Sequence, residues 1–221
     1  MLIRLRQGIK VNDPVASVID YYEKTAKTGK GTRAYDEARP QEDDSFSEAR
    51  ILQSIELINR LGARMPYKAA ELLLQKKDEI ESRLADVPAR LTILDSYEEI
   101  PWEKLKSLFD SFRVKYVGLA RMTKILHKKR PNLIPILDKN ILVNKYLEPL
   151  LRAQGIIVRD ATERAVCYIK ELKEDIDRNR EAFTKVQQNL KSEGYDISLL
   201  RILDILIWYH FIYEDRSVQT I

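Results

Sequence analysis

Residues 102–138 read WEKLKSLFDSFRVKYVGLARMTKILHKKRPNLIPILD, and this stretch decides the fold class. Apolar side chains recur at three- and four-residue spacing over 102–113, as expected of a helix that buries one face. A five-residue turn follows over 114–118, and the same spacing resumes over 119–129. The stretch therefore begins as two helices joined by a tight turn.

The end of the same stretch predicts a third helix. Arg130 and Pro131 end the second helix, because proline disfavours the helical conformation in the residue before it. Residues 132–137, NLIPIL, form an apolar connection, and Asp138 is of the type that caps a helix N-terminus. We therefore expect a helix from Asp138 to about residue 151.

The rest of the chain favours a mainly α-helical fold. The sequence has 221 residues, of which only seven are glycine and 33% are charged, a composition typical of helices. Proline after Asp13 predicts a helix over 14–27, and residues 1–12 alternate loosely, as in a short strand. Residues 28–46 contain glycines, a proline and an acidic cluster, which predicts a long loop.

These elements suggest an N-terminal arm over 1–45 and a helical domain over 46–221. Within the domain, residues 161–191 have apolar side chains at heptad spacing, interrupted at Asn179. Such spacing fits a coiled coil with a partner helix, but over so few heptads it favours a packing face within the chain. The heptad positions are Ile169, Leu172, Ile176, Phe183, Val186 and Leu190.

Several classes of protein are disfavoured by composition. Cys167 is the one cysteine, so no disulfide can form within the chain, and two histidines without a second cysteine do not provide the usual zinc spacings. The most apolar run, 199–213, contains charged residues and is too short to span a bilayer. We expect no metal, no cofactor and no membrane association. The chain opens without an apolar signal-peptide core, which indicates a cytoplasmic protein.

Positive charge is concentrated between Arg113 and Lys145. This segment of 33 residues holds nine lysines and arginines and one acid, Asp138, so its net charge is +8 and the remainder of the chain sums to −4. A local excess of this kind indicates a surface for phosphates, although a solvated helix face has the same pattern.

The helix expected over 119–129 has a cationic stripe opposite its apolar stripe, which we predict faces either water or a phosphate backbone. Gly118 comes directly before this helix, where free backbone N–H groups can bind an anion. We expect His127 to be exposed or to face a phosphate. The candidate contacts to nucleic acid are Gly118, Arg121, Lys124, His127, Lys128, Lys129 and Arg130.

The order of elements from Trp102 to Leu151 resembles that of the helix-hairpin-helix DNA glycosylases. The resemblance covers about 50 residues and implies a degenerate hairpin, at about 102–130, that grips the phosphates of duplex DNA through backbone amides. It also implies that Asp138 assists cleavage of a glycosidic bond. From about residue 47 to 212 the chain is similar to an uncharacterised bacterial family that shares this helical core, a likeness that implies no activity.

Two positions depart from the glycosylase pattern. Tyr116 stands where the family favours the first glycine of its hairpin, and Ala120 stands where the strand-cutting members have lysine. Lys124 lies one helical turn further on and is not an obvious substitute. If the chain is an enzyme, the resemblance therefore implies a monofunctional N-glycosidic hydrolase that excises a base without Schiff-base lyase chemistry.

Three functions remain open from the sequence. The chain is a base-excision enzyme, a non-catalytic nucleic-acid-binding module, or a non-catalytic helical protein-interaction module. Asp138 is correspondingly a catalytic carboxylate or a plain helix cap, and one residue can be both. Asp204, an acid in an apolar helix, either pairs with Arg201, caps a neighbouring backbone group, or is functional through a pKa raised by burial.

Overall fold

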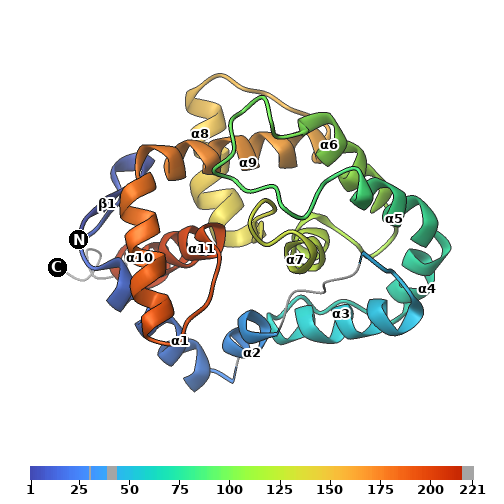
Figure 1. Cartoon of the computed structure of the whole chain (residues 1–221), viewed down its shortest axis with the longest axis horizontal. Helices are drawn as coiled ribbons and strands as arrows, with labels where there is room; N and C mark the ends of the chain where they lie inside the picture. The colour runs from blue at the N-terminus through green and yellow to red at the C-terminus, as the bar shows by residue number, and fades with distance from the viewer. Residues whose placement is uncertain (30, 39–43, 216–221) are drawn as a thin grey trace.

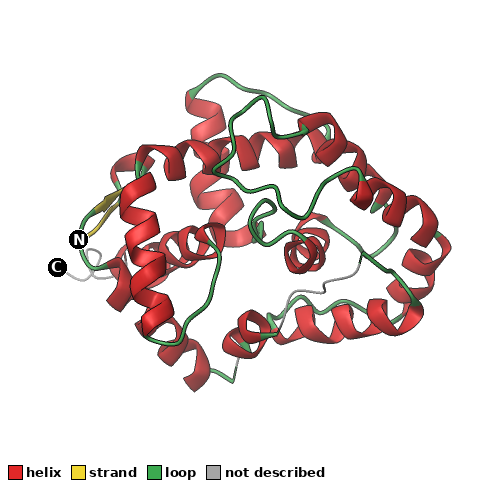
Figure 2. Ribbon diagram, in the orientation of Figure 1, coloured by secondary structure: helices red, strands yellow, loops and turns green. Residues whose placement is uncertain are grey.

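Helices make up most of the computed structural model, which describes residues 1–29, 31–38 and 44–215 (Figures 1 and 2). The predicted fold class, mainly α with a short N-terminal β element, is confirmed. The elements are β1 (Ile3–Arg4), η1 (Arg6–Gly8), β2 (Lys10–Val11), α1 (Pro14–Lys27), α2 (Thr32–Glu37), α3 (Glu48–Arg60), α4 (Lys68–Gln75), α5 (Lys77–Ala85), α6 (Trp102–Ser111), α7 (Leu119–Lys129), the π-helix η2 (Lys139–Leu147), α8 (Glu148–Ala153), α9 (Ala161–Arg178), α10 (Arg180–Ser192), α11 (Leu199–Tyr209) and the π-helix η3 (His210–Glu214).

Helix α7 is the centre of this arrangement. Figure 1 shows it nearly end on, with the other helices around it, and it packs against α3 and α9. Each residue from Met122 to Arg130 is buried. A helix that is enclosed on all sides has no solvent face on which to display charge, so its cationic side chains need partners inside the protein.

Helices α9 and α10 place their heptad positions inside the molecule. The chain changes direction at Asn179, whose φ of −124° and ψ of 22° separate the two helices, as the sequence predicts. The interpretation of this spacing as an internal packing face is confirmed. Each of its six side chains is at most 1% exposed: Ile169, Leu172, Ile176, Phe183, Val186 and Leu190.

The segment predicted as a loop over 28–46 contains a helix. Residues 32–37 form α2, because contacts from distant elements fix it. The Tyr35 ring is fully buried, and its hydroxyl donates to the Lys124 carbonyl at 2.8 Å. The Thr32 and Thr25 hydroxyls are hydrogen-bonded at 2.6 Å. The rest of the predicted loop includes 30 and 39–43, which lie outside the described residues.

The N-terminal arm shares the core of the helical domain. Ile3 of β1 and Val18 of α1 are fully buried and belong to the same apolar cluster as the later helices, and α1 packs along α11. Strands β1 and β2 pair antiparallel. The Arg6 guanidinium binds Glu171 and Asp175 of α9, which ties this end of the chain to the domain.

Helix α11 is the most apolar element, and it forms part of the core. All of its residues from Leu199 to Ile207 are buried, and the Ser198 hydroxyl caps its N-terminus by accepting from the Arg201 amide at 3.1 Å. Across the described ranges, no helix combines the length and the apolar character that a membrane crossing requires.

Candidate functional site

The turn between α6 and α7 has a residue in the backbone conformation that favours glycine. Tyr116 has a φ of +72°, in the left-handed region that L-amino acids rarely adopt. The glycosylase resemblance expects a glycine at this position, so the tight turn forms without it. Gly118 has an ordinary φ of −84°, and no atom lies within 4 Å of the place where a Cβ would stand.

Arg121 is committed to this turn. Its guanidinium donates to the carbonyl of Tyr116 at 2.6 Å and to the carbonyls of Ala63 and Arg64 at 2.9 Å. The side chain is therefore a brace between the α6–α7 turn and the segment after α3. It holds the backbone amides at the start of α7 in place. Each of its three nitrogen atoms donates to a carbonyl within the protein.

The remaining predicted phosphate contacts of α7 are buried. Lys124 and Lys128 are each 8% exposed, and Lys129 and Arg130 are 4% and 3% exposed. The prediction that the cationic stripe faces water or a phosphate is therefore wrong for Lys124 and Lys128. The ammonium groups lie among backbone carbonyls because long cationic side chains can carry their charge through an apolar layer to acceptors beyond it.

The acceptors come from segments that precede α7 in the chain. Lys128 Nζ donates to the Ala38 carbonyl at 2.9 Å, and Lys129 Nζ donates to the Ser45 carbonyl at 3.1 Å. Arg130 donates to the Leu84 carbonyl at 2.9 Å and binds Asp44 through both Nη1 and Nη2 at 2.8 Å. These cations hold the arm and the α5 end onto α7, which is a structural role.

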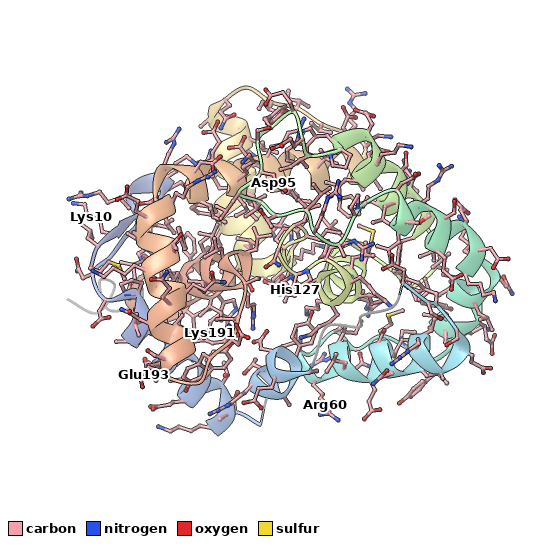
Figure 3. The ribbon with its side chains drawn as sticks, in the orientation of Figure 1. Lys10, Arg60, Asp95, His127, Lys191 and Glu193 are labelled. Atoms are coloured by element: carbon pink, nitrogen blue, oxygen red, sulfur yellow. The ribbon has the colours of Figure 1, made fainter. Side chains whose placement is uncertain are left out.

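His127 is also an internal residue, and the prediction that it is exposed or faces a phosphate is wrong. Only 4% of it is exposed, and Figure 3 shows it in the middle of the molecule, away from Lys10 and Arg60 at the rim. Its Nδ1 donates to the Ile134 carbonyl at 2.7 Å. Burial lowers the pKa of the imidazole to about 4, so the ring is neutral at pH 7.

The extended connection after α7 directs alternate side chains to opposite sides. Leu137 lines one pocket, whereas its neighbours Ile136 and Asp138 line another, as expected of a stretch with a two-residue period. Asp138 caps η2 by accepting from the amides of Asn140 at 3.1 Å and Ile141 at 2.9 Å. The prediction that Asp138 begins a helix is confirmed.

Asp138 shares its pocket with four other ionisable side chains, those of Tyr21, Lys124, Arg201 and Asp204. The pocket has a volume of about 120 Å³ and lies between α1, α7 and α11. Burial lowers the pKa of the Lys124 ammonium, and the charges of Asp138 and Asp204 partly offset this effect. The pocket is lined by Tyr21, Thr25, Thr32, Leu61, Lys124, Ile136, Asp138, Arg201, Asp204 and Trp208.

Asp204 is the most perturbed acid of this pocket. It is 4% exposed, and burial raises the pKa of its carboxyl to about 6 despite the adjacent Arg201 guanidinium. Arg201 Nη1 binds Asp204 Oδ2, so the predicted pairing of these two residues is confirmed. Arg201 also binds Asp36 through Nε and Nη2, each at 2.9 Å, so one guanidinium serves two carboxylates.

A second pocket lies on the other side of the connection, beside the start of α7. It has a volume of about 510 Å³. It is lined by Gly118, Leu119, Ala120, Arg121, Leu137, Lys139, Val143, Asn144, Glu148, Arg152, Ala161, Arg164 and Tyr168. The start of α7 and the cap of η2 thus separate a wide surface pocket from the smaller pocket that contains Asp138.

Three exposed lysines remain in the basic segment between Arg113 and Lys145. Lys115, Lys139 and Lys145 are exposed, and none of them has an ion pair within the part of the chain that the structure describes. Of the nine cationic residues between Arg113 and Lys145, these are the ones available to an external anion. The positive charge that reaches the surface is therefore smaller than the count along the sequence.

Some residues of the Asp138 pocket were not candidates from the sequence. Tyr21, Thr25 and Thr32 come from the arm, which the sequence separates from the domain. Asp36 binds the same guanidinium as Asp204, that of Arg201, although Asp36 and Arg201 are 165 positions apart in the chain. No local pattern signals these residues. The described residues contain no group of three or more His, Cys, Asp or Glu side chains placed to hold a metal ion.

Comparison with known proteins identifies a family and no function. Residues 14–211 match the model of a family described as "Family of unknown function (DUF6308)", and the chain belongs to this family. No curated protein matches the chain, and no solved structure matches it. The function must therefore be argued from the site itself.

Proposed function

We propose that this member of a family of unknown function binds duplex DNA and hydrolyses the N-glycosidic bond of one of its nucleotides. The observation that carries the proposal is the pocket of about 120 Å³ in which Asp138, Lys124 and Asp204 meet. Ionisable groups with perturbed pKa values gathered in one pocket are typical of active sites. The order of elements that resembles the helix-hairpin-helix glycosylases adds the type of reaction.

Asp138 is the catalytic carboxylate in this proposal. Its side chain caps η2 and lines the pocket at the same time, so the backbone fixes its position. A carboxylate beside the sugar of an extruded nucleotide stabilises the positive charge that develops at C1′, or orients the attacking water. Lys124 lies in the same pocket, and its ammonium group interacts with the charges of both Asp138 and Asp204.

The DNA contacts in the proposal differ from those expected from the sequence. Lys128, Lys129 and Arg130 are bound to backbone carbonyls, and His127 is neutral and buried, so these side chains do not serve as contacts. We assign phosphate binding to the amides that begin α7 at Gly118, with Lys115 and Lys139 nearby. Backbone N–H groups at a helix start bind phosphate oxygens well, and two lysines give a salt-dependent affinity.

The test replaces Asp138 and compares it with a matched cap. Asp160 caps α9 in the same way, accepting from the amides of Thr162 and Glu163 at 3.0 Å, but lies outside the pocket. We expect wild type to release a base from at least one duplex in a panel of damaged bases. Asp138→Asn should lower the rate at least about 100-fold, and Asp160→Asn should leave it unchanged.

The same assay separates the alternatives. Binding of duplex DNA without release of any base would refute the enzyme and leave a non-catalytic module. Full activity in Asp138→Asn would make Asp138 a helix cap only. Borohydride added during turnover traps a Schiff base if an amine attacks the sugar; we expect no cross-link, and a cross-link that disappears in Lys124→Met would establish lyase chemistry instead.

A further inference from the structure

We infer that Asp204 is the proton donor of this site, and that the base released is one that accepts a proton as it leaves. The inference rests on the proposed function. It starts from the position of Asp204 on α11, which lines the same pocket as Asp138 but from a different element. Two carboxyl groups in one pocket divide the roles of acid and base when their surroundings differ.

The surroundings of the two carboxyl groups do differ. Asp138 is half-buried at a helix start and accepts from two backbone amides, which stabilise the carboxylate. Asp204 is 4% exposed in the middle of an apolar helix, where burial favours its neutral form. Asp204 is therefore the member of the pair that its surroundings favour as a proton donor.

The charged groups around Asp204 act on it in opposite directions. Arg201 gives Nε and Nη2 to Asp36 and only Nη1 to Asp204. Asp204 therefore shares its guanidinium partner with Asp36. The negative charge of Asp138 also raises the pKa of the Asp204 carboxyl. Lys124 on α7 is the second cation that interacts with Asp204. Tyr21 on α1 is neutral at pH 7, because burial raises the pKa of its hydroxyl to about 12. Lys128 on α7 in turn faces Asp36 and Arg201, so this group contains as many cations as carboxyl groups. Burial, and not an excess of negative charge, is therefore what favours a proton on Asp204.

One oxygen of Asp204 is free to deliver that proton. Oδ2 accepts from Arg201, whereas Oδ1 has no hydrogen-bond partner among the described residues. Each fully enclosed side-chain oxygen and nitrogen atom in those residues has a partner, so Oδ1 is not sealed off and opens on the pocket that Asp204 lines. A proton on Oδ1 would point at the occupant of the pocket.

The reaction balances with these two groups and water. The C1′–N bond breaks and its electron pair goes to the base, which takes the proton from Asp204 at a ring nitrogen. Water adds its oxygen to C1′ and gives a proton to Asp138. The products are an abasic sugar and a neutral base, and exchange with solvent returns a proton to Asp204. A purine, with basic ring nitrogens, suits this donor better than uracil, which leaves as a stable anion.

The experiment measures base release against pH on two probes, a duplex with one hypoxanthine and a matched duplex with one uracil. In wild type, hypoxanthine release should fall as pH rises above about 6, because the donor loses its proton. Asp204→Asn should lower the maximal rate about 100-fold and abolish this fall. Asp175→Asn is the control, since Asp175 is a fully buried carboxylate paired with Arg6 at a distant site; its pH profile should match that of wild type.

Carbon-13 NMR of the aspartate carboxyls gives a reading that needs no activity. We expect one resonance that titrates near pH 6 and is missing from Asp204→Asn. If Asp204→Asn releases hypoxanthine with the wild-type pH profile, or if the Asp204 resonance stays ionised down to pH 4, the inference fails while the proposed function stands. If wild type releases no base from the whole panel of damaged duplexes at any pH, the proposed function fails, and the resonance alone then decides whether Asp204 holds a proton.

Discussion

Replacing His127 by asparagine should change how the stability of the protein depends on pH. The native imidazole is 4% exposed and has its pKa lowered by burial to about 4, whereas a histidine in an unfolded chain has a pKa of about 6.5. Between these values the unfolded chain binds a proton that the folded chain does not. Acidification therefore favours unfolding, and the contribution of neutral His127 is lost as the pH falls.

The size of the effect follows from the two pKa values. From pH 7.5 to pH 4.5, a group with a pKa of about 4 folded and about 6.5 unfolded lowers the free energy of unfolding by about 2.5 kcal/mol. Asp204 acts in the opposite direction, because its raised pKa of about 6 makes the folded state bind a proton first. Its contribution is present in both proteins, so it cancels when the variant is compared with wild type.

Urea unfolding followed by circular dichroism at 222 nm, at four pH values between 4.5 and 7.5, measures the difference. Asparagine keeps an N–H donor near the position of Nδ1 for the Ile134 carbonyl, so the variant should fold. We expect it to be less stable at pH 7.5, where a cavity remains, and to lose about 2.5 kcal/mol less than wild type on acidification. Curves that stay parallel within about 0.5 kcal/mol would refute a buried neutral His127.

Two further predictions concern the turn before α7 and the end of α7. Tyr116→Gly should raise the free energy of unfolding by about 1 kcal/mol, because it removes a side chain from a residue with a φ of +72°. The control Gly118→Ala, at a φ of −84°, should change the melting temperature little. A fall in stability for Tyr116→Gly would contradict the prediction. Arg130→Ala should lower the free energy of unfolding by about 3 kcal/mol, because the buried carbonyls of Val87 and Leu84 lose their hydrogen-bond donor. The control Lys139→Ala, on the surface, should have a free energy of unfolding in urea within about 0.5 kcal/mol of wild type.

The elements of the site that depend on neighbours in sequence could be predicted. Helix α7 follows from its three- and four-residue spacing, and Asp138 as a cap follows from its place after an apolar stretch. The pairing of Arg201 with Asp204 is also local, since the two residues are three positions apart on one helix. In each case the partner lies within one helical turn, where residue type and spacing decide the contact.

The burial of the cationic end of α7 could not be predicted in this way. On sequence rules Lys124 and Lys128 lie on a polar face, because lysines are rarely buried without a partner. Their partners are the carbonyls of Leu61 and Ala38, which are 63 and 90 positions away. The same reason explains α2, whose glycine-rich and acidic surroundings indicate a loop. Tyr35 and the Thr25–Thr32 pair fix it as a helix.

The carbonyl contacts of Lys128, Lys129 and Arg130 also set an order of assembly during synthesis. Their acceptors lie at Ala38, Ser45 and Leu84, all of which leave the ribosome before residue 128 does. The arm and the α3–α5 segment therefore lack these contacts until the end of α7 has emerged. A nascent chain of about 120 residues would expose the apolar faces that α7 later covers, and such exposed faces favour aggregation until α7 emerges.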